Sequence, residues 1–330
     1  MTVLDFEKPI VELEKKIVEL RNLSTSGELD LDSEVKKLEA RLAHVKKETY
    51  VNLTPWQRVQ IARHPKRPYT LDYIQMIFSD FMELHGDRTF ADDKALIGGF
   101  ARLDGRSFLV MGHQKGRDAK ENIMRNFGSA HPEGYRKALR LMRLAEKFLT
   151  PIVVFVDTPG AYPGVGAEER GQAYTIAVNI REMARVKVPI FVYVIGEGGS
   201  GGALGIGIAD RVGVMENAYY SVISPEGCAA ILWKDRTKAP EAAAALRLTA
   251  KDLLDMKLID EVLKEPLGGA HQNPQAMAES LKLSIQKNLK EIESEDPRRL
   301  VETRYEKFRC MGVFETAEVR SRENKVPSRQ

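Results

Sequence analysis

The residues with the clearest chemical meaning are five glycines within seven positions, from Gly196 to Gly202. They follow Val188–Ile195, an apolar run rich in β-branched and aromatic residues, which predicts a strand buried on both faces of a parallel sheet. The small apolar residues of Ala203–Ala209 then indicate a closely packed helix. A glycine turn that leads into a helix brings unpaired backbone N–H groups close to a ligand. The sequence therefore predicts a site for negative charge.

One interpretation of this turn is a dinucleotide site. Gly196, Gly198 and Gly201 match the spacing G-x-G-x-x-G, and Glu216 lies twenty residues past the first glycine, where an acid could bind a ribose. This pattern is weak by itself, and it normally opens a domain, whereas here a strand and a helix precede it. An NAD(P)-binding oxidoreductase is nevertheless the alternative to the function given below.

Two further interpretations concern phosphate and oxyanion binding. A P-loop is excluded because Ala203 and Leu204 stand where Lys and Ser or Thr are required. An oxyanion site fits better, since N–H groups at a helix N-terminus suit charge that develops on a carbonyl oxygen. Such a site needs no catalytic side chain.

Side chains for acid–base chemistry are scattered through the sequence. Ser200 has no histidine that the sequence places beside it, so no Ser-His-Asp arrangement can be derived. We expect the histidines to be structural and the acids to serve more often as caps or loop hydrogen-bonding groups. The residues considered were His64, His113, His131 and His271, and Asp157, Glu168, Glu169 and Glu226.

A second glycine-rich loop, Gly160–Gly166, follows another predicted buried strand, Ile152–Val156. In open α/β sheets ligands bind outside the carboxyl ends of the strands. Both glycine-rich loops should lie at that edge, and we expect them to converge.

The stretch Gln114–Gly128 is locally basic and contains Lys115, Arg117, Lys120 and Arg125 without obvious acidic partners. It is either a solvated loop and helix face or a contact for cofactor phosphates or an acidic partner.

Composition sets the frame for these sites. The 330 residues, 43% apolar, suit one large α/β domain with helical additions. Fifty basic and 47 acidic residues leave a net charge of +3, which gives no reason to expect a nucleic-acid binder. Only Cys228 and Cys310 are present, and without a leader or a long apolar run they predict a cytoplasmic protein that does not span a membrane.

The remaining pattern predicts the elements that position the loops. Residues 1–50 show two narrow apolar stripes broken at Ser24–Asp30, which predicts a helical hairpin that serves as a brace or a subunit contact. A helix is predicted to include Tyr73 to Leu84, and Asp104-Gly105 predicts a hairpin turn between two strands. Further helices are predicted over Glu133–Phe148, Glu168–Arg185, Pro225–Trp233, Thr249–Met256, Pro274–Ile292 and Pro297–Cys310, and short strands over Arg211–Met215 and Tyr219–Val222.

Several long motifs resemble the carboxyltransferase alpha subunit of bacterial acetyl-CoA carboxylase. The most specific are DTPGAYPGVGAEERGQ (Asp157–Gln172), IGEGGSGGAL (Ile195–Leu204) and YSVISPEGCA (Tyr220–Ala229). ARHPKRPYTLDY, GHQKGR and EPLGGAH agree as well, and the resemblance runs from about Asp5 to about Leu300.

The resemblance implies an α/β fold, a crotonase-type ββα spiral, rather than a doubly wound Rossmann sheet. Together with the periodicities it gives four segments. These are a helical hairpin (1–50), a connector and helix (51–94), the carboxyltransferase domain (95–295), and a C-terminal helix with a frayed tail (296–330).

It also implies the reaction and its participants. The family transfers CO2 from carboxybiotin, held on the biotin carboxyl carrier protein, to acetyl-CoA and forms malonyl-CoA. It works with a beta subunit as an α2β2 assembly, next to biotin carboxylase. A zinc ion is expected in the beta subunit and no metal in this chain.

By the same resemblance, the N–H groups of Gly201 and Gly202 bind the biotin oxygen. Gly160 or Ala161 would supply a second donor. Lys115 and Arg117 are the candidates for substrate binding.

Overall fold

A single mixed β-sheet forms the centre of the protein in a computed structural model that describes residues 3–25 and 31–312. Its eight strands follow the order β1-β2-β3-β4-β5-β6-β8, and β7 pairs with β5. The strands are β1 (Ser79–Glu83), β2 (Leu96–Leu103), β3 (Arg106–His113), β4 (Ile152–Thr158), β5 (Ile190–Gly199), β6 (Arg211–Met215), β7 (Tyr219–Ser221) and β8 (Glu261–Leu263).

Strand direction follows from the connections. β1, β2 and β3 are antiparallel, and the turn that joins β2 to β3 has positive φ at Asp104 (50°) and Gly105 (81°), as a tight hairpin requires. From β3 to β6 and β8 the pairing is parallel. Every residue of β4 and β5 is buried, which confirms the prediction of two-sided burial from their continuous apolar runs.

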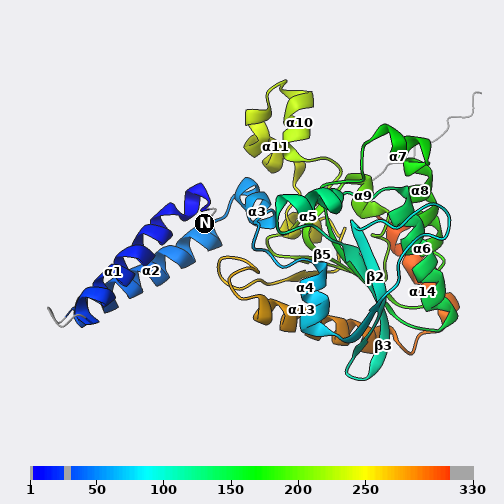
Figure 1. Cartoon of the computed structure of the whole chain (residues 1–330), viewed down its shortest axis with the longest axis horizontal. Coiled ribbons are helices and arrows are strands. Elements are labelled where there is room, and N and C mark those ends of the chain that lie inside the picture. Colours follow the sequence, from blue (N-terminus) through cyan, green and yellow to red (C-terminus); the bar gives the residue numbers. More distant parts are fainter. Residues whose placement is uncertain (1–2, 26–30, 313–330) are drawn as a thin grey trace, which may run out of the picture.

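Helices cover both faces of this sheet (Figure 1). The site depends most on α4 (Thr70–Ile77), α6 (Pro132–Lys147), α8 (Gln172–Met183) and α9 (Ser200–Leu204). The others are η1 (Asp5–Glu7), α1 (Lys8–Thr25), α2 (Asp32–Val51), α3 (Pro55–Ala62), α5 (Ala119–Met124), η2 (Asn126–Gly128), α7 (Val165–Glu169), α10 (Pro225–Leu232), η3 (Arg236–Lys238), α11 (Ala239–Leu246), α12 (Ala250–Asp255), α13 (Pro274–Ile292) and α14 (Pro297–Arg309).

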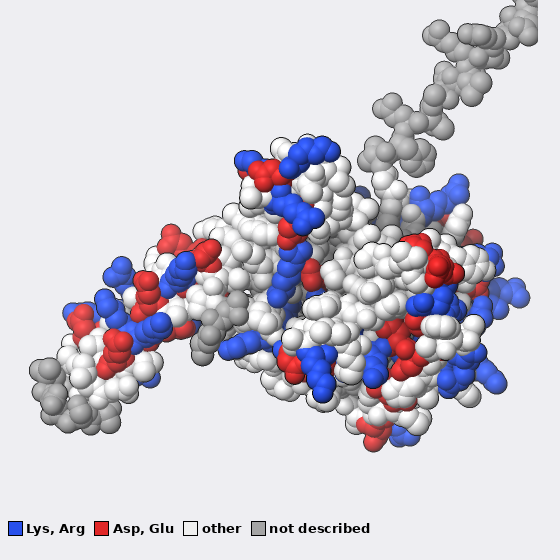
Figure 2. Space-filling view, turned by 45° about the horizontal axis from the view of Figure 1, so that its top comes forward, with Lys and Arg blue, Asp and Glu red and all other residues white. Residues whose placement is uncertain are grey.

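The N-terminal helices α1 and α2 lie side by side and project from the body as an arm (Figure 1). Ile10, Ile17 and Val35 are buried, and the ion pair between Lys46 and Glu14 (2.6 Å) joins the helices. Charges of both signs cover the arm (Figure 2), as expected for two narrow apolar stripes. Residues 26–30, on which most of the predicted break falls, lie outside the described residues, as does the tail from 313 to 330. None of the described helices is long and apolar enough to cross a membrane.

The helix predicted through Leu84 is wrong in its second half. α4 ends at Ile77, Phe78 is extended, and Ser79–Glu83 forms β1 against β2. Tertiary pairing explains the difference, because β2 offers a free edge whose backbone groups β1 satisfies. Phe78 also packs edge-on against Phe108. The connector and helix predicted for residues 51–94 therefore contain two helices and an edge strand.

A buried ion pair attaches α14 to the amino ends of β5 and β6. Nε and Nη2 of Arg304 donate to the carboxylate of Asp210, at 2.8 and 2.7 Å. The guanidinium also donates to three carbonyl oxygens, those of Met183, Val186 and Val188. Asp210 in turn accepts from the N–H of Ile190, the first residue of β5 (2.7 Å).

We expect Arg304→Met to lower the free energy of unfolding by ~3–5 kcal/mol, because Asp210 would stay buried without its cation. The exposed Arg298 of α14 provides the control, and Arg298→Met should change stability by no more than ~0.5 kcal/mol. Urea unfolding of both variants measures this difference. Equal free energies of unfolding for the two variants would contradict a stabilising role of the ion pair between Arg304 and Asp210.

Candidate active site

The two glycine-rich loops meet at the carboxyl edge of the sheet, as predicted. A Cβ atom placed on Gly202 would lie 2.5 Å from the amide nitrogen of Ala161 and 2.5 Å from the carbonyl carbon of Gly160. One placed on Gly199 would lie 2.2 Å from the carbonyl oxygen of Pro159. Only glycine allows this approach of backbone to backbone, so these residues are glycines for a tertiary reason.

Short helix α9 begins at the turn with Gly199 as its N-cap, and no side chain caps it. The first N–H groups of a helix have no partner within the helix, so those near Gly201 and Gly202 can bind a ligand. Ser200 has φ +50°, a conformation that is uncommon outside glycine and that occurs frequently at functional sites. At Gly201 there is room, since an added Cβ would meet only Ile176 Cδ1 at 3.6 Å.

An irregularity in β5 directs this turn. Val156 pairs with Val194 and Thr158 pairs with Gly198, so β5 advances four residues while β4 advances two. Two backbone groups freed by this bulge are satisfied by side chains. Arg67 Nε donates to the carbonyl oxygen of Ile195 (2.6 Å), and the N–H of Glu197 donates to Asp157 Oδ1 (3.0 Å).

Five charged or polar side chains gather at the bulge. Lys115 Nζ contacts Asp157 Oδ1 at 2.6 Å and Glu197 Oε2 at 2.8 Å. The other oxygen of Glu197 accepts from Arg63 Nε and from the Tyr219 hydroxyl, each at 2.7 Å. Asp157 and Glu197 are only 3% and 9% exposed, so each carboxylate is held by partners within the protein rather than by water.

The environment keeps Glu197 and Lys115 ionised. Burial pushes the pKa of Glu197 upward, but the charges of Lys115 and Arg63 outweigh it and hold that pKa at about 2. Burial lowers the pKa of Lys115, yet Asp157 and Glu197 together raise it above its usual value. At neutral pH the two groups are therefore charged and unsuited to proton transfer.

Three of the four basic side chains in Gln114–Gly128 have acidic partners that were not obvious from the sequence. Arg117 pairs with Asp72 and stacks over the ring of Tyr69 at 3.9 Å, and Arg125 contacts Glu121. Lys120 is exposed on α5. The contact of Lys115 and Arg117 with substrate stays a prediction, with the ammonium of Lys115 directed at two carboxylates.

The four histidines considered from sequence stack on other rings or lie in the core, and their structural role stays a prediction. His64 stacks on His271 at 3.9 Å between ring centroids, and His131 stacks on Tyr162 at 4.0 Å. His113 is fully buried without a hydrogen-bond partner for its ring, and burial together with Lys115 lowers its pKa to about 3. It therefore remains neutral at physiological pH.

Of the acids considered from sequence, one belongs to the cluster, one contacts a member of it, and two do neither. Asp157 holds Lys115, and Glu226, at the start of α10, pairs with Arg63. Glu168 and Glu169 are exposed on α7. Sequence reasoning missed Arg63, Glu197 and Tyr219. The available signal was Glu197 itself, a carboxylate inside an otherwise apolar strand, which demands a buried cation.

An apolar pocket of about 270 Å³ adjoins the turn on the side of α14. It opens beside Ser200 and has one phenol, that of the partly buried Tyr220, whose pKa burial raises to about 12. The rest of the lining is mainly aliphatic and aromatic and includes Leu204, Ile208, Val222, Leu253, Leu258, Phe308 and Met311.

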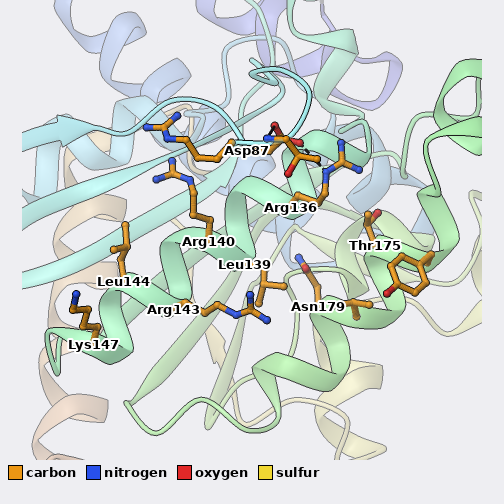
Figure 3. Close-up of a pocket in the computed structure, with 13 residues that line it drawn as sticks. Asp87, Arg136, Leu139, Arg140, Arg143, Leu144, Lys147, Thr175 and Asn179 are labelled. Atoms are coloured by element: carbon orange, nitrogen blue, oxygen red, sulfur yellow. Dashed lines mark hydrogen bonds and ion pairs between the residues drawn. The ribbon is translucent and has the colours of Figure 1, made fainter.

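A larger groove of about 590 Å³ runs along α6 and α8 (Figure 3). Two of its cations hold the neighbouring loop: Arg136 pairs with Asp87 at 2.7 Å, and Arg140 donates to the carbonyls of Gly86 and His85. The groove contains none of the residues of the two glycine-rich loops. We therefore place the site at the loops and their smaller pocket.

The turn does not have the geometry of a dinucleotide fingerprint. Gly196 and Gly198 lie within β5 rather than after it, and a Cβ on Gly196 would lie 2.5 Å from Asp157 Oδ1. Glu216 accepts from the N–H of Glu265 instead of facing the turn.

The fold resembles solved structures of related architecture. A transcarboxylase 12S structure with methylmalonyl-coenzyme A has a TM-score of 0.57 at 20% identity, covering 72% of this chain and 45% of that chain. A Pseudomonas malonate decarboxylase hetero-tetramer in complex with coenzyme A has a TM-score of 0.57 at 15% identity, covering 71% and 91%. The α/β fold is thus of the crotonase type, as predicted.

Sequence comparison then gives the family. The model "Acetyl co-enzyme A carboxylase carboxyltransferase-like" matches residues 3–312. Proteins named acetyl-coenzyme A carboxylase carboxyl transferase subunit alpha are similar: that of Thermus thermophilus is 58% identical and that of Geobacter metallireducens 57%. Each alignment covers 94% of this chain and 98% of the relative. The chain belongs to the carboxyltransferase alpha subunit family of acetyl-CoA carboxylase, and the oxidoreductase alternative is not supported.

Metal ligands are a separate question. Within residues 3–25 and 31–312, no group of three or more His, Cys, Asp or Glu side chains is arranged to hold a metal ion. Cys228 is buried and Cys310 exposed, and both are free thiols.

We expect the stabilising contribution of Glu197 to be lost at low pH. Its pKa in the fold, about 2, lies below its ordinary 4.5, so the contribution is complete above about pH 5 and disappears as the pH falls toward 2. Urea unfolding of the wild-type chain and of Glu197→Gln at several pH values measures this. The gap in stability should narrow on acidification, and a gap that does not depend on pH would contradict the assigned ionisation.

Proposed function

We propose that this chain supplies the biotin side of a carboxyltransferase active site. Together with a beta subunit it transfers CO2 from carboxybiotin, on the biotin carboxyl carrier protein, to acetyl-CoA and forms malonyl-CoA. The observation that carries the proposal is the close approach of the start of α9, which no side chain caps, to the amide of Ala161. A Cβ atom added to Gly202 would lie only 2.5 Å from that amide nitrogen.

This arrangement suits the charge that the reaction develops. Removal of CO2 leaves negative charge on the ureido oxygen of biotin, and the N–H groups of Gly201 and Gly202 are proposed to bind it. Ala161 or Gly160 is proposed as the second donor. Fixed N–H donors of this kind need no reorganisation during the reaction. The apolar pocket beside Ser200 is large enough for a compact apolar ring system and supports the same assignment.

The side chains near the loops hold geometry rather than exchange protons. Lys115 and Glu197 are both ionised and paired, so proton transfer is left to the biotin nitrogen and the thioester methyl group. In this proposal the chain's own task is to bind and orient, and to stabilise the oxyanion.

Exposed apolar side chains around the loops support a partner at this edge. Val165, Tyr174 and Val222 are 76%, 73% and 76% exposed, and Leu204 is 41% exposed. Such residues are typical of protein interfaces when they cluster. We propose the beta subunit, with its zinc ion, as the chain that covers them in an α2β2 assembly. The carrier protein, biotin carboxylase and acetyl-CoA complete the cytoplasmic system, and we propose that the hairpin of residues 1–50 contributes to assembly.

Reconstitution tests this function. The purified chain alone should form no malonyl-CoA, because the proposed site is completed by a second chain. Mixed with the beta subunit of a close relative, carboxybiotin and acetyl-CoA, it should form malonyl-CoA at a rate that depends on both proteins. Robust synthesis by the single chain, or none by a well-assembled mixture, would contradict the proposal.

We expect Gly202→Ala to lower turnover by ~10²-fold in an assembled complex, since displacing positioned groups by about 1 Å has effects of that size. The methyl group would push the Gly160–Ala161 backbone away from α9. Gly201→Ala should have a smaller effect, because its Cβ would meet only a flexible isoleucine methyl. Steady-state kinetics of both complexes gives the comparison. A larger loss of turnover in Gly201→Ala than in Gly202→Ala would contradict a role for the close contact between the two loops.

A further inference from the structure

Substrate binding does not explain why the side chain of Lys115, only 12% exposed, ends on two carboxylates beside the glycine turn. Lys115 follows β3, and its backbone is fixed by Gln114, whose N–H donates to Ala95 and whose side-chain amide donates to the carbonyl of Lys115 itself. Its stem passes Gly128, where an added Cβ would lie 2.9 Å from Lys115 Cγ. The chain has therefore left space for this side chain to reach inward.

The ammonium group ends between two neighbouring strands. Asp157 is the residue before the last of β4, and Glu197 lies two residues before the end of β5. Lys115 contacts both carboxylates within hydrogen-bonding distance, 2.6 and 2.8 Å. It therefore links the two strands where their ladder is interrupted between Val156 and Thr158.

The positions of the proposed N–H donors depend on the interrupted β4–β5 ladder, where regular backbone pairing is missing. Immediately beyond it, β4 leads to Ala161 and β5 leads to Gly202. Regular ladder hydrogen bonds would hold two strands in register, but the bulge replaces them with side-chain contacts. Without the cation, the carboxylates of Asp157 and Glu197 would repel each other across this gap.

We propose that Lys115 is a positioning residue that sets the separation of the two oxyanion donor loops. This inference rests on the proposed function for its kinetic consequence, and it replaces substrate contact as the role of Lys115. In this proposal the alignment of the Ala161 and Gly202 amides depends on the ion pairs of Lys115 as well as on the glycines.

The experiment uses the full chain assembled with its beta partner. Lys115→Met keeps the length of the stem and removes the charge, and Lys115→Arg keeps the charge. The double variant Lys115→Met with Asp157→Asn removes one charge of each sign. Glu197 keeps Arg63 as its cation in this variant, so no buried carboxylate is left without one. Lys120→Met, at an exposed position of α5, is the matched control.

We expect both Met-containing variants to lower kcat by ~10- to 100-fold while the KM for acetyl-CoA stays within about twofold. Lys115→Arg should recover part of the loss, and Lys120→Met should match the wild type. A raised KM with unchanged kcat would overturn the inference in favour of substrate contact. Normal turnover of the double variant would also overturn it, and so would its failure to fold, which would give Lys115 a role in folding alone.

Hydrogen exchange gives a readout that is independent of activity. Peptides covering residues 157–164 and 196–204 should exchange faster in the double variant than in the wild-type complex, and other strands should be unchanged. Unchanged exchange in both peptides would refute positioning even if the wild-type complex proved inactive. An inactive wild-type complex with faster exchange in the variant would instead refute the proposed function and leave the positioning role supported.

Discussion

The glycine turn depends on one buried carboxylate. Glu197 interrupts an apolar strand, and such a group is tolerated only where cations and donors replace its water. Lys115, Arg63 and Tyr219 supply them from three separate parts of the chain. Because hydrogen bonds to these partners require a particular geometry, they fix the position of Glu197 and of the irregular end of β5. Helix α9 starts from this end.

Strand β5 is secured by buried arginine–carboxylate pairs at both ends. At its amino end Arg304 and Asp210 hold the N–H of Ile190, and near its carboxyl end Arg67, paired with Glu265, takes the carbonyl of Ile195. Arg67 and Arg304 are each 1% exposed. Breaking such pairs is strongly unfavourable, so the strand that carries the turn is restrained along its length. The apolar core between these pairs supplies the stability, and the pairs select one arrangement of the strand ends.

Close backbone packing and charge placement serve the same loops. At Gly199 and Gly202 the absence of a Cβ allows backbone contact between the loops after β4 and β5. Lys115 then fixes the strand ends from which these loops leave. Neither device alone would align amide groups at two loops, since glycine permits an approach without enforcing it. Exposed apolar side chains lie next to the loops, on the side where the proposed second chain would bind.

Local sequence by itself determined the buried parallel strands, the hairpin at Asp104-Gly105, the N-terminal helical pair and the two glycine loops at one sheet edge. Each depends on periodicity or on a turn residue, which are properties of neighbouring positions. The motifs also sufficed for the family. Only the tertiary structure decided that Ser79–Glu83 is an edge strand, because pairing with β2 outweighs helical periodicity there. It alone joined Lys115 to Asp157 and Glu197, residues 42 and 82 positions apart, since ion pairing across such separations depends on strand order and on a bulge that no local pattern announces.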